Sequence, residues 1–138
     1  MTKKILDTNV YIDLFTNPEL YEDIFVSEGS VYLSSVVLME LLAGAHSKNE
    51  KRRVKALIAL LNKLGRIITP ALKDYEQAGE ILTKLQSIKG YNLKKSASIT
   101  NDCLIAASAR SLGAVLYTQN KKDFQAIQAV FDFKVTFV

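Results

Sequence analysis

The sequence is poor in the residues that most often build disulfides, metal clusters and histidine-dependent active sites. It contains one cysteine, Cys103, and one histidine, His46, among 138 residues. A single cysteine excludes an internal disulfide and a cysteine-based zinc cluster, and a single histidine excludes a histidine-rich catalytic centre. Any chemistry of this chain must therefore use other side chains.

Long apolar runs are also absent. No unbroken apolar segment approaches the roughly 20 residues that a membrane-spanning helix needs, and the apolar residues Ile5 and Leu6 are followed at once by Asp7. We therefore expect a soluble, unsecreted, cytoplasmic protein that does not bind a membrane. At 138 residues and 49% hydrophobic composition, the chain suits one domain, residues 1–138, with a substantial core.

The excess of basic over acidic residues is small. Lys and Arg number 18 against 14 acidic residues, which gives a formal net charge of +4. Such a basic bias assists the encounter with a polyanion by long-range attraction, but it does not identify a nucleic-acid partner.

Short apolar segments alternate with helical patterns along the chain. Strands that alternate with helices predict an α/β fold with a mostly parallel sheet covered on both faces. Residues 89–98 show no periodicity and are predicted to form a loop. The predicted strands are residues 3–7, 30–34, 66–70, 114–118 and 133–137, and the predicted helices are residues 10–15, 18–28, 36–44, 48–64, 74–88, 100–112 and 123–130.

Polar residues stand where two predicted strands end. Asp7 closes the first strand, and Asn120 and Asp123 follow the strand that ends at Thr118. In a parallel sheet with right-handed crossovers, every strand-to-helix junction lies at the same edge, where open α/β sheets bind ligands. We therefore expect these side chains to face one cleft.

Two further acids are expected to reach this cleft from helices. Glu40 lies in a helix that is apolar on nearly every other side, where an unpaired carboxylate is costly to bury. Asp102 lies in the first turn of a helix, and that helix must begin over the same edge of the sheet. Clustered carboxylates repel one another unless a cation neutralises them, and oxygen ligands alone favour Mg²⁺ or Mn²⁺. Such a site can activate water and cleave a phosphodiester bond.

Each acid also has a purely structural interpretation. Asp7 and Asp123 can cap the helices that follow them, because aspartate is favoured at the N-cap. Asp102 can interact with the dipole of its helix, and Glu40 can be a surface residue. The joint placement of the four acids, more than any one of them, favours a metal site.

Four segments in order carry a family resemblance. They are residues 6–9 (LDTN), 34–44 (SSVVLMELLAG), 101–109 (NDCLIAASA) and 118–124 (TQNKKDF). Together they resemble the motifs of PIN-domain proteins, in particular the VapC-type toxins of bacterial toxin–antitoxin pairs. Each motif alone is weak, but the ordered set spans essentially the whole chain and is strong.

The resemblance implies a three-layer α/β/α sandwich with a mostly parallel central sheet, and a Mg²⁺- or Mn²⁺-dependent endoribonuclease that cleaves RNA. Asp7, Glu40 and Asp102 match the three core metal-site acids of the family. For the fourth position the chain offers Asn120 and Asp123, of which we take Asp123 as the acid and Asn120 as a polar contact.

Further expectations about the site and its partners follow from the same resemblance. Thr8, Asn9 and Thr118 match small polar positions that hold the acids and their water network. The family also implies a homodimer and a cognate antitoxin whose C-terminal segment covers the cleft. The apolar residues that can meet such a segment, unless they belong to the core, are Tyr11, Leu14 and Phe15.

Basic residues cluster in two places in the sequence. The basic run at 48–53 and the pair Lys94 and Lys95 are candidate phosphate contacts, although a solvated helix face is preferred for Arg52 and Arg53.

One alternative function is an RNA-processing or DNA-directed nuclease of the PIN fold without an antitoxin. The other is a catalytically silent binding module of the same fold.

Overall fold

Five parallel strands form the central sheet of the computed structural model, which describes residues 2–138 apart from the side chains of Leu20 and Val26. The strand order across the sheet is β3-β2-β1-β4-β5. In chain order the strands are β1 (Lys3–Leu6), β2 (Ser30–Ser34), β3 (Ile67–Ile68), β4 (Ala114–Thr118) and β5 (Lys134–Phe137).

The order of the strands reverses at the centre of the sheet. From β1 the chain continues outward through β2 to β3, then crosses back to β4 on the other side of β1 and ends at β5. In open α/β sheets such a reversal leaves a crevice at the carboxyl ends of the strands, where ligands bind. Here the crevice lies beyond the ends of β1 and β4.

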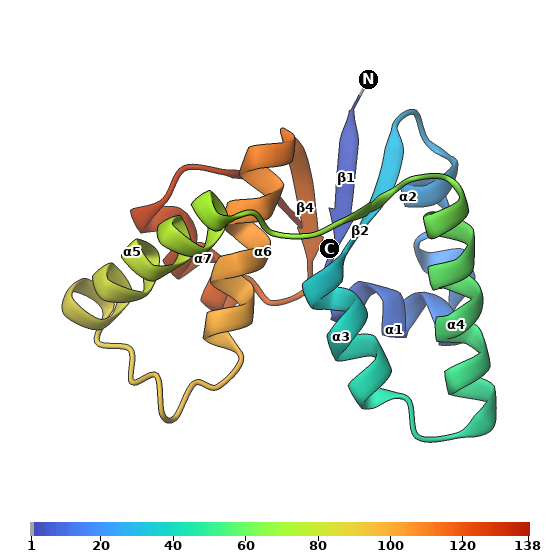
Figure 1. Ribbon diagram of the computed structural model, residues 1–138, viewed down its shortest axis with the longest axis horizontal. Coiled ribbons are helices and arrows are strands. Elements are labelled where there is room, and N and C mark those ends of the chain that lie inside the picture. The colour runs from blue at the N-terminus through green and yellow to red at the C-terminus, as the bar shows by residue number, and fades with distance from the viewer. Residues whose placement is uncertain (1) are drawn as a thin grey trace.

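Helices cover both faces of the sheet, which confirms the predicted three-layer α/β/α fold. Figure 1 shows α5, α6 and α7 gathered on one side of the strands, and α1, α2 and α4 on the other. In the part of the chain that is described, no helix is long and apolar enough to cross a bilayer. The helices are α1 (Thr8–Thr16), the 3₁₀ turn η1 (Pro18–Leu20), α2 (Glu22–Val26), α3 (Ser35–Gly44), α4 (Lys48–Lys63), α5 (Leu72–Lys89), α6 (Ile99–Leu112) and α7 (Lys121–Val130).

The central strands and α6 supply the middle of the core. Ile5 and Leu6 of β1 and Leu116 of β4 are fully buried, as expected for strands covered on both faces. Burying each such side chain contributes about 1.5–3 kcal/mol. Helix α6 buries small residues such as Ala106 and Ala109, which lets it pack closely against α5 and β4. The acids described below therefore project from a rigid frame.

Several predicted boundaries differ from the structure. The strand predicted at 66–70 is only two residues long, because its partner β2 ends at Ser34, which pairs with Ile68. The helix predicted at 18–28 is divided into η1 and α2. The helix predicted from residue 100 begins one residue earlier, at Ile99, which is fully buried.

Candidate active site

Asp7 stands at the carboxyl end of β1, in the central crevice of the sheet. It is 4% exposed. One carboxylate oxygen, Oδ1, accepts a hydrogen bond of 2.8 Å from the backbone N–H of Thr8 and so caps α1. The other, Oδ2, accepts a bond of 2.7 Å from the hydroxyl of Thr118 at the end of β4, and one of 3.3 Å from Asn9 Nδ2. Both strand ends therefore fix this carboxylate.

Glu40 approaches from the second turn of α3 and shares a partner with Asp7. Its Oε1 accepts a hydrogen bond of 2.7 Å from the hydroxyl of Thr8. Its Oε2 accepts one of 3.4 Å from Asn101 Nδ2, at the start of α6. Thr8 thus contacts Asp7 with its backbone and Glu40 with its side chain, which brings these two acids into one site.

Asp102 enters the same site from the first turn of α6. It is 5% exposed, and its Oδ2 accepts one long hydrogen bond of 3.4 Å from Asn120 Nδ2. The same amide donates at 3.1 Å to Oδ2 of Asp123 in α7. The other oxygen of Asp123, Oδ1, accepts a hydrogen bond of 2.7 Å from the hydroxyl of Tyr91. A single asparagine therefore bridges two of the four acids.

The electrostatics of the site are dominated by burial and by repulsion among the acids. Within residues 2–138 the hydrogen-bond partners of these carboxylates are all neutral groups. Burial raises the pKa of Asp7, although the hydrogen bond from Thr118 opposes this. Burial also raises the pKa of Asp102 to about 8, with further contributions from the charges of Asp7, Glu40 and Asp123. A cation would relieve this cost.

The donor set suits a hard divalent ion, although its side chains are not yet turned toward one centre. Among the described residues, no group of three His, Cys, Asp or Glu side chains is disposed to hold a metal ion. The carboxylate oxygens are directed instead at the hydroxyl and amide donors around them. Four acids supplying only oxygen nevertheless form the ligand type that Mg²⁺ and Mn²⁺ prefer. As a set of oxygen donors, the residues fit such an ion in their chemistry.

All eight residues singled out in the sequence lie in this region. The structural interpretation of Asp7 also holds, because it caps α1 while it faces the other acids. The capping interpretation of Asp123 does not hold: Asn120 is the N-cap of α7, and its Oδ1 accepts from the backbone N–H of Asp123. The eight residues are Asp7, Thr8, Asn9, Glu40, Asp102, Thr118, Asn120 and Asp123.

Sequence reasoning missed three residues that contact the site. Asn101 precedes Asp102 and was part of a recognised segment, but its bond to Glu40 was not expected. Gln119 donates its backbone N–H to Asn9 and its side chain to Asp13. Tyr91 lies in the loop that has no periodicity, 32 positions before Asp123, and no local pattern indicates their contact.

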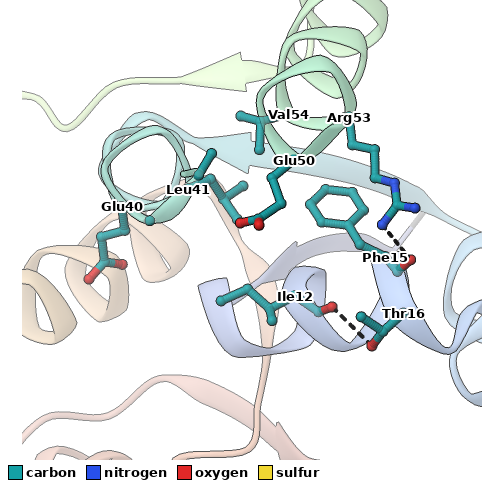
Figure 2. A pocket seen from close by; sticks show the side chains of 10 residues that line it. Ile12, Phe15, Thr16, Glu40, Leu41, Glu50, Arg53 and Val54 are labelled. Atoms are coloured by element: carbon teal, nitrogen blue, oxygen red, sulfur yellow. Dashed lines mark hydrogen bonds between the residues drawn. The ribbon is translucent and has the colours of Figure 1, made fainter. Parts of the chain in front are cut away.

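An apolar pocket adjoins the acids between α1, α3 and α4. Figure 2 shows Ile12 and Phe15 from α1 facing Val54 from α4, with Glu40 at one end. Arg53 Nη1 donates a hydrogen bond of 3.2 Å to the carbonyl of Phe15. The residues that line the pocket are Ile12, Phe15, Thr16, Glu40, Leu41, Gly44, Ala45, Glu50, Arg53 and Val54.

The three apolar residues that were expected to be either core or partner contacts differ in their burial and in whether they line the pocket. Tyr11 is 1% exposed and belongs to the core. Leu14 is half-buried and packs against the core. Phe15 is also half-buried but lines the pocket. Only Phe15 of the three is therefore available to a partner at this place.

Comparisons with known proteins agree with this geometry. The sequence profile of the PIN domain matches residues 4–130. The chain is 32% identical over 130 residues to Ribonuclease VapC1 of Rickettsia felis, across 91% of each protein. It is 29% identical over 130 residues to the tRNA(fMet)-specific endonuclease VapC of Shigella flexneri, across 92% of this chain and 93% of that one.

The fold has close counterparts among solved structures. The structure of VapBC-1 from nontypeable Haemophilus influenzae superposes with a TM-score of 0.73 at 25% sequence identity. The superposition covers 99% of this chain and 98% of the other. The similarity therefore includes the strand ends and helix starts that carry the four acids.

Proposed function

The chain belongs to the PIN-domain family, and from this premise we propose that it is a Mg²⁺- or Mn²⁺-dependent endoribonuclease, the toxin of a toxin–antitoxin pair. Its relatives are named as VapC ribonucleases, and its structural counterpart is a VapBC protein. The observation that carries the proposal is the convergence of Asp7, Glu40, Asp102 and Asp123 at the switch point of the sheet. The 138 residues act as one nuclease domain in the cytoplasm.

The residues of the site have separate tasks in this mechanism. Asp7, Glu40 and Asp102 would hold the ion, and Asp123 would add its negative charge to the site. A bound divalent ion lowers the pKa of its water and neutralises charge that develops on the scissile phosphate. The Thr118 hydroxyl is fully buried, donates to Asp7 and accepts from the N–H of Asn120, so it fixes the orientation of the acid on β1.

Cleavage of RNA by an Asp7→Asn variant tests the proposal. The amide keeps the size of the side chain and an oxygen for the N–H of Thr8, but it removes the charge that would bind the ion. We expect the purified variant to fold as the parent does and to lose Mn²⁺-dependent cleavage, and EDTA to abolish cleavage by the parent. Fragment gels, sequencing of RNA ends and circular dichroism measure these outcomes.

Asp13→Asn is the matched control, because Asp13 lies on the same helix but bonds to Gln119 instead of to the other acids. It should cleave at close to the parent rate. Cleavage by Asp7→Asn at the parent rate would refute the proposal. Preference for DNA would favour the DNA-directed nuclease, and absence of a calorimetric signal with Mn²⁺ would favour the silent binding module.

The apolar pocket supports the antitoxin partner in the proposal. Its walls of Ile12, Phe15 and Val54 suit the apolar side chains of an amphipathic segment, and it ends at Glu40 of the acid site. A segment bound there would cover the route to the acids. A Phe15→Asp substitution should weaken binding of the cognate antitoxin and leave cleavage by the free protein intact.

A homodimer is the remaining part of the proposal. Helix α3 exposes Met39 and Leu42, which are 51% and 43% exposed, and α5 exposes Leu72 at 77%. None of these side chains lines the apolar pocket, so they are available to a second copy of the chain. Light scattering of the purified protein measures its oligomeric state directly.

A further inference from the structure

The loop that follows α5 reaches the acid site through one side chain, Tyr91. Helix α5 ends at Lys89 and is capped by Gly90, whose φ of 69° lies in the left-handed region. The ring of Tyr91 packs against the core, and its hydroxyl donates to Asp123 Oδ1 at 2.7 Å. Tyr91 is therefore the point at which this loop touches the acids.

The Tyr91 hydroxyl is not needed to shape the loop. The backbone N–H of Tyr91 donates to the carbonyl of Leu85 at 3.1 Å, which closes the end of α5. Further along, the backbone N–H groups of Lys95 and Ser96 both donate to the carbonyl of Asn92 at 3.0 Å. Because these bonds and the packing of the ring hold the loop, the hydroxyl has Asp123 as its one hydrogen-bond partner among the described residues.

Asp123 depends on this bond more than Asp7 depends on any one of its donors. It is half-buried, in the first turn of α7, and Asn120 holds its Oδ2 from one side. Asp7, by comparison, is buried and accepts from three donors. Without the Tyr91 hydroxyl, Oδ1 of Asp123 would lose its side-chain donor, and the carboxylate would be held on the Oδ2 side alone, by Asn120.

We propose that Tyr91 is a positioning residue, which holds the Asp123 carboxylate in the orientation that the metal-dependent reaction requires. The inference rests on the proposed function, because it takes Asp123 as an acid of the metal site. The phenol acts through Asp123 and does not contact the ion or the scissile phosphate.

A double-mutant cycle between Tyr91→Phe and Asp123→Ala tests the inference. Phenylalanine keeps the ring and removes only the hydroxyl. Tyr91→Phe should lower kcat about tenfold and weaken Mn²⁺ binding about threefold to tenfold, the scale of losing one hydrogen bond to a carboxylate. KM for RNA should be nearly unchanged. In the Asp123→Ala background, Tyr91→Phe should cause no further loss in either quantity.

Calorimetry with Mn²⁺ alone and thermal unfolding in EDTA provide readouts that do not depend on activity. If Asp123→Ala abolishes cleavage, the Mn²⁺ affinities still complete the cycle. The matched control is Tyr75→Phe, because Tyr75 is 54% exposed on α5, outside the acid site. Both Tyr91→Phe and the control should unfold within about 2 °C of the parent in EDTA.

The possible failures are distinguishable. If the parent neither cleaves RNA nor binds Mn²⁺, the proposed function fails. If the parent cleaves and Asp7→Asn does not, but Tyr91→Phe equals the parent, the inference alone fails. The inference is also overturned if Tyr91→Phe has the same effect with and without Asp123, or if its loss of activity is matched by a loss of stability in EDTA.

Discussion

Two aspartates of this protein, Asp74 and Asp102, are buried to the same degree but have opposite surroundings. They are 4% and 5% exposed. Asp74, in the first turn of α5, accepts a hydrogen bond of 2.9 Å from the N–H of Ala71 and a short bond from the hydroxyl of Ser111. Asp102, in the first turn of α6, accepts one bond of 3.4 Å from the part of the chain that is described, and it faces three other carboxylates.

The difference separates an acid that links parts of the fold from an acid of the proposed metal site. A buried carboxylate with strong neutral donors links parts of the fold, here the start of α5 and the end of α6. A buried carboxylate among like charges costs folding free energy, and such costs accumulate where a bound ligand relieves them. Burial alone therefore does not identify the site, whereas burial next to other acids does.

The largest expected difference is in catalysis. Asp102→Asn should lower the rate of Mn²⁺-dependent RNA cleavage by at least about 100-fold, because it removes one charge from the set that stabilises the transition state. Asp74→Asn should stay within about threefold of the parent, since its partners are structural. Initial rates at saturating Mn²⁺ measure both. Equal losses in the two variants would contradict the distinction.

The second difference is in stability, and here Asp74 has the larger effect. Asp74→Ala leaves the Ala71 N–H and the Ser111 hydroxyl without their acceptor and should destabilise the folded protein by about 2 kcal/mol. Urea denaturation measures this loss. Glu76→Ala, an exposed position on the same helix, is the control and should change the unfolding free energy by less than about 0.5 kcal/mol. A neutral Asp74→Ala variant would show that its hydrogen bonds do not stabilise the fold.

The contrast also shows what the sequence could and could not reveal. Asp7 was predictable as a site residue, because a short apolar strand ends at it and parallel strands share one carboxyl edge. Asp102 was harder, because its helix had to begin over that edge. The sequence predicts the start of this helix to within one residue of Ile99, but its place over that edge depends on tertiary packing, in which Ile99 is fully buried.

Contacts between distant residues account for most of what was missed. The bond between Tyr91 and Asp123 and the bond between Ser111 and Asp74 join residues 32 and 37 positions apart. No spacing rule applies at such separations, since only the packing of α5, α6 and α7 sets them. The sequence showed Asp74 as the first residue of a predicted helix and gave no sign that it is buried.

The third expected effect concerns pH and the metal-free protein. An aspartate in an unfolded chain has a pKa of about 3.9. In the folded protein, burial and the charges of Asp7, Glu40 and Asp123 raise the pKa of Asp102 to about 8. Between these pH values the folded protein holds a proton that the unfolded chain has lost, so raising the pH favours unfolding. In EDTA, the unfolding free energy should therefore fall from about pH 5 to about pH 8.

Replacing Asp102 or Asp74 by asparagine tests whether Asp102 causes this decline in the unfolding free energy. Asp102→Asn removes the titrating carboxyl, so it should flatten the decline and unfold a few degrees above the parent at about pH 8 in EDTA. Asp74→Asn is the control, because it leaves Asp102 and the carboxylates beside it unchanged. Saturating Mn²⁺ should stabilise the parent more than Asp102→Asn, since binding to the folded state alone raises stability. If Asp102→Asn kept the slope of the parent, repulsion at Asp102 would not be a cost of folding, and Asp74 and Asp102 would differ only in their hydrogen bonds.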